Sequence, residues 1–234
     1  MKKVALLSLF ALLFLATFAN AATLFYGGDF DENNNSANAL ANETDAIVVG
    51  DPYGAAVFQN FIVGGGGWNV TGLFTNNLSS NSTPTGGYWE VRAGLSEGNG
   101  GTLIASGTGA VTNDPTGRSG FGFTEYHNEV DGLNLNLTPG TYWLAVVPQC
   151  ADCGGRSFLG NTFGTNSIGS QTSDQQFWNS AFFGVNYTNA DTQGTFSTFS
   201  SGVVGTEVPE PSSMVMLGSG LVAAAGVVRR RLSR

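Results

Sequence analysis

The chain has 234 residues with nine basic and 17 acidic side chains, a net charge of −8. Six of the basic residues lie near the two termini. The stretch from Ala22 to Glu207 therefore keeps only Arg92, Arg118 and Arg156 against 16 acidic residues, a net charge of −13. Such an acidic surface repels phosphates, which excludes nucleic acid as a partner. Its length suits one domain with a hydrophobic core.

The amino terminus has the three parts of a secretory signal peptide. Lys2 and Lys3 precede an apolar run from Val4 to Phe18, and Ala19-Asn20-Ala21 is an A-x-A cleavage site. The sequence predicts a signal peptide at residues 1–21, removed by signal peptidase after the secretion machinery engages it. A retained membrane helix is the alternative, but the run is short for a span.

Oxygen-bearing side chains recur at every second position soon after this site, at Asp29, Asp31, Asn33 and Asn35. This spacing can wrap a hard cation such as Ca²⁺, although the EF-hand pattern fails at its glycine and at its last glutamate. A solvated loop is the alternative. Calcium is the one cofactor that the sequence suggests.

The interior predicts an all-β fold, because glycine-rich turns separate short apolar stretches and no helical period is present. In the strand at 67–74, Trp68, Val70 and Phe74 share one face. The strand at 87–95 alternates between two faces, as a half-buried antiparallel strand requires. Its two sets are Trp89, Val91, Ala93 and Leu95 on one side and Tyr88, Glu90 and Arg92 on the other.

Residues 133–137 alternate as well, and the turn Thr138-Pro139-Gly140 leads into an apolar strand at 141–147. We interpret this unit as a hairpin whose second strand lies in the middle of a sheet. Further strands are predicted at 46–49, 55–63, 102–107, 119–126, 177–187 and 195–199. About ten short strands without βαβ spacing predict an antiparallel β-sandwich of jelly-roll type at 22–196.

Catalysis finds little support in the sequence. Glu90, Glu125, Glu129 and Asp131 could form a glycosidase pair, but no spacing singles out two of them. His127 has no recognisable nucleophile beside it. We predict that the protein is not an enzyme.

Cys150 and Cys153 form a C-x-x-C motif, which can be a redox dithiol, half of a zinc site or a small structural disulfide. The exported context favours the disulfide. Zinc would need two more ligands, and a redox pair would precede a helix, whereas Gly154 and Gly155 follow here. Redox and metal roles remain the alternatives.

Most tryptophans and tyrosines in strands belong to the core, but exposed ones can stack on sugar rings. Trp178 and Tyr187 lie near Asn179, Asn186 and Asn189. We name Trp178 and Tyr187 as candidates for a glycan-binding patch.

Residues 197–207 consist mostly of Ser, Gly, Thr and Val and predict a flexible linker. The tail at 208–234 then combines three signals in a fixed order. These are the extended motif Val208-Pro209-Glu210-Pro211, an apolar segment at 212–228, and a basic end formed by Arg229, Arg230, Arg231 and Arg234. The 15 uncharged residues from Met214 make roughly 22 Å of helix, a marginal membrane span. The positive-inside rule places the arginines in the cytoplasm.

This order of motif, apolar segment and arginines resembles the C-terminal signal of PEP-CTERM proteins. Gram-negative bacteria that make exopolysaccharide export these proteins and process them with a membrane-embedded enzyme, exosortase. The resemblance covers residues 208–234, so it implies a route and a processing partner and assigns no activity to the domain.

Two hypotheses follow for the exported domain. The first is a non-catalytic protein of the cell surface or extracellular matrix, associated with exopolysaccharide. The second is a carbohydrate-binding module with a specific glycan site, and a glycoside hydrolase comes after both.

Overall fold

The computed structural model describes residues 21–44, 54–80, 83–149, 155–172, 175–194 and 198–210. Nearer the C-terminus it describes residues 216, 218–220, 226–227 and 229–231. Residues 1–20 of the predicted signal peptide, the predicted strand at 46–49 and both cysteines of the C-x-x-C motif lie outside the described residues.

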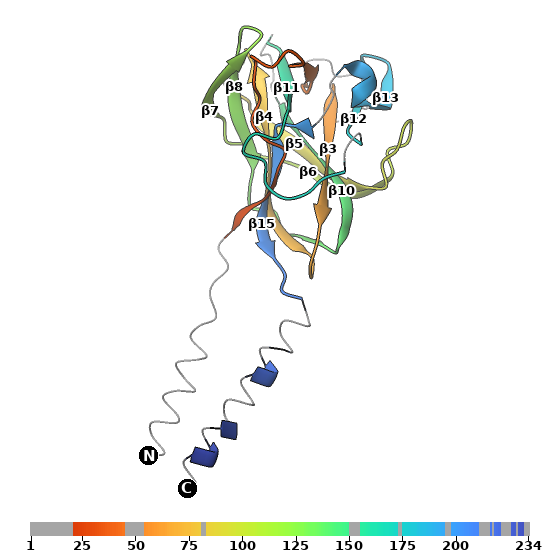
Figure 1. Ribbon diagram of the computed structural model, residues 1–234. Coiled ribbons are helices and arrows are strands. Elements are labelled where there is room, and N and C mark those ends of the chain that lie inside the picture. Colours follow the sequence, from red (N-terminus) through yellow and green to blue (C-terminus); the bar gives the residue numbers. More distant parts are fainter. Residues whose placement is uncertain are drawn as a thin grey trace.

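The described chain folds into two antiparallel β-sheets (Figure 1). The nine-stranded sheet has the order β1 (Ala22–Tyr26), β15 (Ser201–Glu207), β4 (Trp68–Ser79), β11 (Ser157–Thr162) and β14 (Thr198–Phe199), with β2 (Ala39–Ala41), β7 (Asp114–Gly120), β8 (Phe123–Val130) and β9 (Leu135–Leu137) attached to it. The six-stranded sheet has the order β13 (Val185–Asn189), β12 (Phe177–Ser180), β3 (Ala56–Val63), β10 (Gly140–Gln149), β5 (Gly86–Ala93) and β6 (Thr102–Gly109). One 3-10 helix, η1, covers Ala190–Gln193. The all-β prediction is confirmed, while the jelly-roll connectivity stays a prediction.

An aromatic cluster joins the two sheets at the centre of the core. Phe61 of the six-stranded sheet is fully buried and stacks on Phe25 and Trp68 of the nine-stranded sheet, with ring centroids 5.9 and 5.8 Å away. Tyr142 of β10 lies 5.9 Å from the same ring. Because one side chain contacts three rings from three strands, Phe61 fixes the two sheets against each other.

A β-bulge changes which side chains of β4 face this core. The pairing of β15 with β4 skips Thr71, so one extra residue enters β4 at that point. The alternation shifts by one residue beyond a bulge. Leu73 therefore joins the core, whereas Phe74 packs against Tyr26 and His127. The prediction that Phe74 shares a face with Trp68 is wrong for this reason.

The predicted hairpin at 133–147 is also wrong. β9 pairs with β4 in the nine-stranded sheet, while β10 pairs with β3 and β5 in the six-stranded sheet. The Thr138–Gly140 turn therefore carries the chain from one sheet to the other. The central position of 141–147 is confirmed, because β10 has a neighbour on each side.

The segment predicted to be a flexible linker, 197–207, instead contributes β14 and β15, and the prediction is wrong from Thr198 onward. β15 lies between β1 and β4, and its Val203 is fully buried. A Cβ at Gly202 would lie 2.3 Å from the ring of Phe74. The small residues of this segment thus permit close packing.

Candidate functional site

The predicted sorting motif begins directly where a central strand ends. β15 ends at Glu207, which pairs with Trp68 at the start of β4. The next amide, that of Val208, donates to the carbonyl of Gly67 at 2.8 Å. No linker therefore separates the motif from the sheet.

A glycine turn, Gly64–Gly67, forms the seat for the first residues of the motif. A Cβ at Gly66 would lie 2.5 Å from the carbonyl oxygen of Val208 and 2.9 Å from that of Pro209. Real side chains do not approach so closely, so glycine is required at this position. At Gly64 a Cβ would meet nothing within 4 Å.

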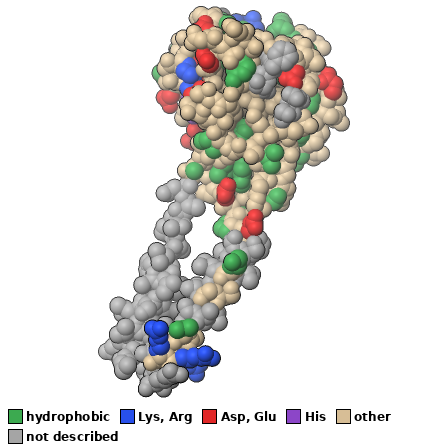
Figure 2. Space-filling view, viewed as in Figure 1, with side chains coloured by type: hydrophobic (Ala, Val, Ile, Leu, Met, Phe, Trp, Pro, Cys, Tyr) green, Lys and Arg blue, Asp and Glu red, His purple; other side chains and the backbone are tan. Residues whose placement is uncertain are grey.

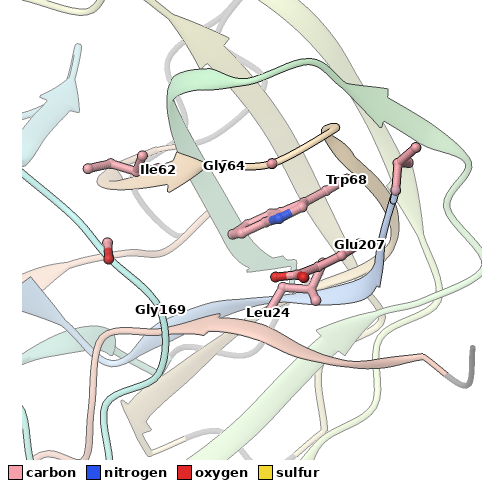
Figure 3. Close-up of a pocket in the computed structure, with 9 residues that line it drawn as sticks. Leu24, Ile62, Gly64, Trp68, Gly169 and Glu207 are labelled. Atoms are coloured by element: carbon pink, nitrogen blue, oxygen red, sulfur yellow. The ribbon is translucent and has the colours of Figure 1, made fainter. Parts of the chain in front are cut away.

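A cavity of about 260 Å³ adjoins this seat. Trp68, Glu207, Leu24 and Val208 contribute to its lining, and the indole of Trp68 lies beside the side chains of Glu207 and Leu24 (Figure 3). Glu207 is the one charged residue among the described lining residues. The lining includes residues of β1, β3, β4 and β15, so the cavity lies at a junction between strands.

Both described ends of the domain emerge on the same side. β1 pairs antiparallel with β15, and Ala22 lies opposite Gly205. The first residues of the predicted mature chain and the sorting motif consequently lie at one end of the molecule (Figure 1). The predicted signal peptide and the sorting motif are therefore attached to the domain at the same end.

The apolar segment and the basic tail are described only in part. Residues 216, 218–220, 226–227 and 229–231 are helical and exposed, whereas Pro211 and Arg234 lie outside the described residues. In the part of the chain that the structure describes, no helix is long and apolar enough to cross a membrane. The spanning helix at 212–228 and the cytoplasmic place of the arginines stay predictions.

The close packing of Gly66 against the motif leads to a testable prediction. We expect Gly66→Ala to displace the start of the motif and break the hydrogen bond between Val208 and Gly67. A bond of about 1 kcal/mol corresponds to roughly fivefold faster exchange of the Val208 amide. Hydrogen exchange followed by NMR would measure this rate. Gly64→Ala is the matched control and should leave it unchanged, and equal rates in both variants would contradict the seat.

Two of the four predicted calcium ligands, Asp29 and Asp31, have hydrogen-bond partners within the protein. The Asp29 carboxylate accepts from the Tyr26 hydroxyl at 2.7 Å and from Asn166 at 2.8 Å, and it pairs with Arg118 at 2.9 Å. Asp31 accepts from the backbone amide of Asn33. Among the described residues, no group of three or more His, Cys, Asp or Glu side chains could hold a metal ion. Calcium at Asp29, Asp31, Asn33 and Asn35 stays a prediction.

The predicted glycan-binding pair does not form one exposed patch, and this prediction is wrong. Trp178 is 9% exposed and lies between the sheets, where its indole N–H donates to Ala41. Tyr187 packs on the outer face of the six-stranded sheet against Phe58, with the Arg92 guanidinium over its ring. Successive residues of a strand point to opposite faces, so Phe177 turns outward and Trp178 inward.

The three arginines of the domain share one arrangement that the sequence analysis did not find. Each pairs with a glutamate that is nearly or fully buried, in the pairs Arg92–Glu90, Arg118–Glu125 and Arg156–Glu43. Figure 2 shows few basic side chains among the acidic ones on the visible face of the domain. The sequence did contain a clue to these ion pairs, because the domain has no lysine and only three arginines. Glu90 and Arg92 already share one face of the predicted strand at 87–95, whereas Glu43 and Arg156 are far apart in the chain.

The pair around Glu125 is the centre of a larger polar network. Glu125 is fully buried and accepts from Thr116 at 2.6 Å and from Arg118 at 2.5 Å. Burial raises the pKa of Glu125 above its ordinary value, although Thr116 and Arg118 oppose the shift. Burial also raises the pKa of Tyr26, whose hydroxyl contacts Asp29 in the same network. Among the described residues, one oxygen of Glu125 has no hydrogen-bond partner.

Three of the four carboxylates considered for glycoside hydrolysis, Glu90, Glu125 and Glu129, are not gathered in one site. Glu90 lies on β5 and accepts from Tyr88 and Arg92, whereas Glu125 and Glu129 lie on β8 of the other sheet. Four residues of strand separate Glu125 from Glu129 by about 13 Å, more than the roughly 5 to 9.5 Å of glycosidase pairs. His127 bridges Asn76 and Glu129.

Two antiparallel sheets whose central strand runs directly into a C-terminal signal define an exported β-sheet domain. The family model of the PEP-CTERM protein-sorting motif matches residues 207–231. The chain carries this motif at its C-terminus, which identifies it as an exported protein that exosortase processes. No curated protein and no solved structure matches the chain.

Proposed function

We propose that the β-sheet domain is a non-catalytic protein of the cell surface or extracellular matrix in a Gram-negative bacterium, and that it associates with exopolysaccharide after processing. The single observation that carries the proposal is the attachment of the sorting motif directly to the central strand β15. The domain is therefore the part of the precursor that is delivered to the outside.

The side-chain chemistry of the domain supports a non-catalytic role. Each of its arginines is engaged by a buried glutamate, and Glu129 is held by His127. Charged side chains that pair with one another in this way stabilise the fold. Association with exopolysaccharide is inferred from the family signal and from a surface without lysine, which relies on hydroxyl and amide groups for hydrogen bonds to sugars.

The experiment that tests this function is the intact mass of the protein recovered from the cell surface or the medium. We expect a chain that begins at Ala22 and ends near Pro209 to Pro211, with any additional mass revealing an attached group. A mass that retains Arg234 would contradict processing.

Association with polysaccharide is tested separately by co-sedimentation of the processed protein with the host's own exopolysaccharide. We expect the protein in the pellet together with the polysaccharide. A protein that stays in the supernatant would refute the association without affecting the sorting result. The carbohydrate-binding module remains the alternative hypothesis, and a glycan array would test it.

A further inference from the structure

Three consecutive residues of the sorting motif lie against the glycine turn. The Val208 amide is bonded to the turn, and the carbonyl oxygens of Val208 and Pro209 lie 2.5 and 2.9 Å from where a Cβ of Gly66 would be. At Gly65, a Cβ would lie 4.0 Å from the side chain of Glu210. The motif therefore follows the turn from its first residue to its third.

The strand that leads into the motif is held by the sheet. β15 has β1 on one side as far as Gly205 and β4 on the other side as far as Glu207. Val208 adds one backbone hydrogen bond beyond this ladder and contributes to the lining of the adjacent cavity. The chain consequently leaves the sheet only after the motif has begun.

The processing enzyme has to reach the same residues, because the matched sorting motif begins at residue 207. Enzymes and other proteins that bind an extended peptide form hydrogen bonds with its backbone and contact side chains along it. The backbone oxygens that pack against Gly66 leave no room for an enzyme on that side of the chain. The start of the motif therefore cannot occupy the turn and an enzyme's cleft at the same time.

We propose that Val208 to Glu210 must leave the glycine turn before exosortase processes the chain, and that Gly66 is a positioning residue that controls this release. Segments held by few contacts open locally without unfolding of the whole domain. When opening and closing are fast, the rate of cleavage follows the population of the open form. The proposal rests on processing by exosortase and does not depend on the association with polysaccharide.

Pulse-labelling of the expressing cell, followed by separation of precursor from processed chain, measures the rate of processing. We expect Gly66→Ala to raise this rate about fivefold, the same factor as for exchange of the Val208 amide, because both report one opening. Gly64→Ala is the matched control, since a Cβ there would meet nothing within 4 Å. It should be processed at the wild-type rate.

An insertion of Gly-Ser-Gly between Glu207 and Val208 tests the same step without a change in the turn. The inserted residues take the place of the motif beside Gly66, and the distance from the motif to the apolar segment stays the same. We expect processing at least as fast as in Gly66→Ala. This variant decides the question if circular dichroism shows that Gly66→Ala is unfolded.

Arg118→Ala distinguishes release of the motif from a general loss of stability. It removes the ion pair with the buried Glu125, which lies outside the turn, so we expect the wild-type processing rate. Unchanged or slower processing in folded Gly66→Ala or in the insertion variant would overturn the proposal, as would equal acceleration by Arg118→Ala. A wild-type chain that is never processed would overturn the sorting itself together with this proposal.

Discussion

Replacement of Phe61 by alanine should lower the free energy of unfolding by about 4 kcal/mol, because truncation of a buried phenylalanine removes its transfer free energy and leaves a cavity. Phe61 is fully buried, and the rings of Phe25, Trp68 and Tyr142 surround it. These rings come from both sheets and cannot all move into the space. Urea unfolding followed by tryptophan fluorescence would measure the loss.

Phe182→Ala provides the matched control for this prediction. Phe182 is 61% exposed in the turn between β12 and β13, so the same truncation there removes little buried surface. We expect its effect to stay within about 0.5 kcal/mol. Similar losses in the two variants would show that Phe61 does not hold the sheets together.

Replacement of Arg118 by alanine should cost about 3 kcal/mol, because it leaves the Glu125 carboxylate buried without a countercharge. Arg118 is the cation that contacts both Glu125 and Asp29. In the double variant Arg118→Ala, Glu125→Gln the buried group is neutral, so part of the loss should return. Urea unfolding of the two variants at pH 7 would compare them.

The cost of Arg118→Ala should also depend on pH in a defined direction. Burial raises the pKa of Glu125 above its ordinary value of 4.5. A raised carboxyl pKa means that the native state holds its proton more tightly than the unfolded state. The stability from Glu125 is then present below about pH 4.5 and is lost as the pH rises through the folded pKa.

Removal of Arg118 raises that pKa further, since the opposite charge no longer favours the carboxylate. The difference between wild type and Arg118→Ala should therefore be small near pH 4 and grow toward pH 7. Urea midpoints across this range would measure it. A difference that stays constant with pH would contradict a charged Glu125 at neutral pH.

Local patterns in the sequence predicted many of the strands correctly. The alternation in 87–95 placed Trp89 and Val91 on the inner face of β5 and Glu90 on the outer face, as the structure does. The apolar character of 141–147 on both faces predicted the central position of β10. Both predictions succeeded because they rest on the residues of one strand. Alternation and burial on both faces can be recognised without knowing the neighbouring strands.

Predictions that depended on partners far along the chain were wrong. The Ser- and Gly-rich composition of 197–207 is typical of linkers, yet it also suits a strand pressed closely between β1 and β4. The bulge at Thr71 and the inward position of Trp178 likewise depend on neighbouring strands. Composition alone cannot distinguish mobility from close packing.

The linear sequence is enough to show the PEP-CTERM sorting motif, because such a motif is a short continuous segment of the chain. It also determined the all-β class through the spacing of apolar residues. Only the folded structure shows that the start of the motif packs on a glycine turn and that Arg156 pairs with the buried Glu43. These features are contacts between distant segments, and they exist only once the strands have paired.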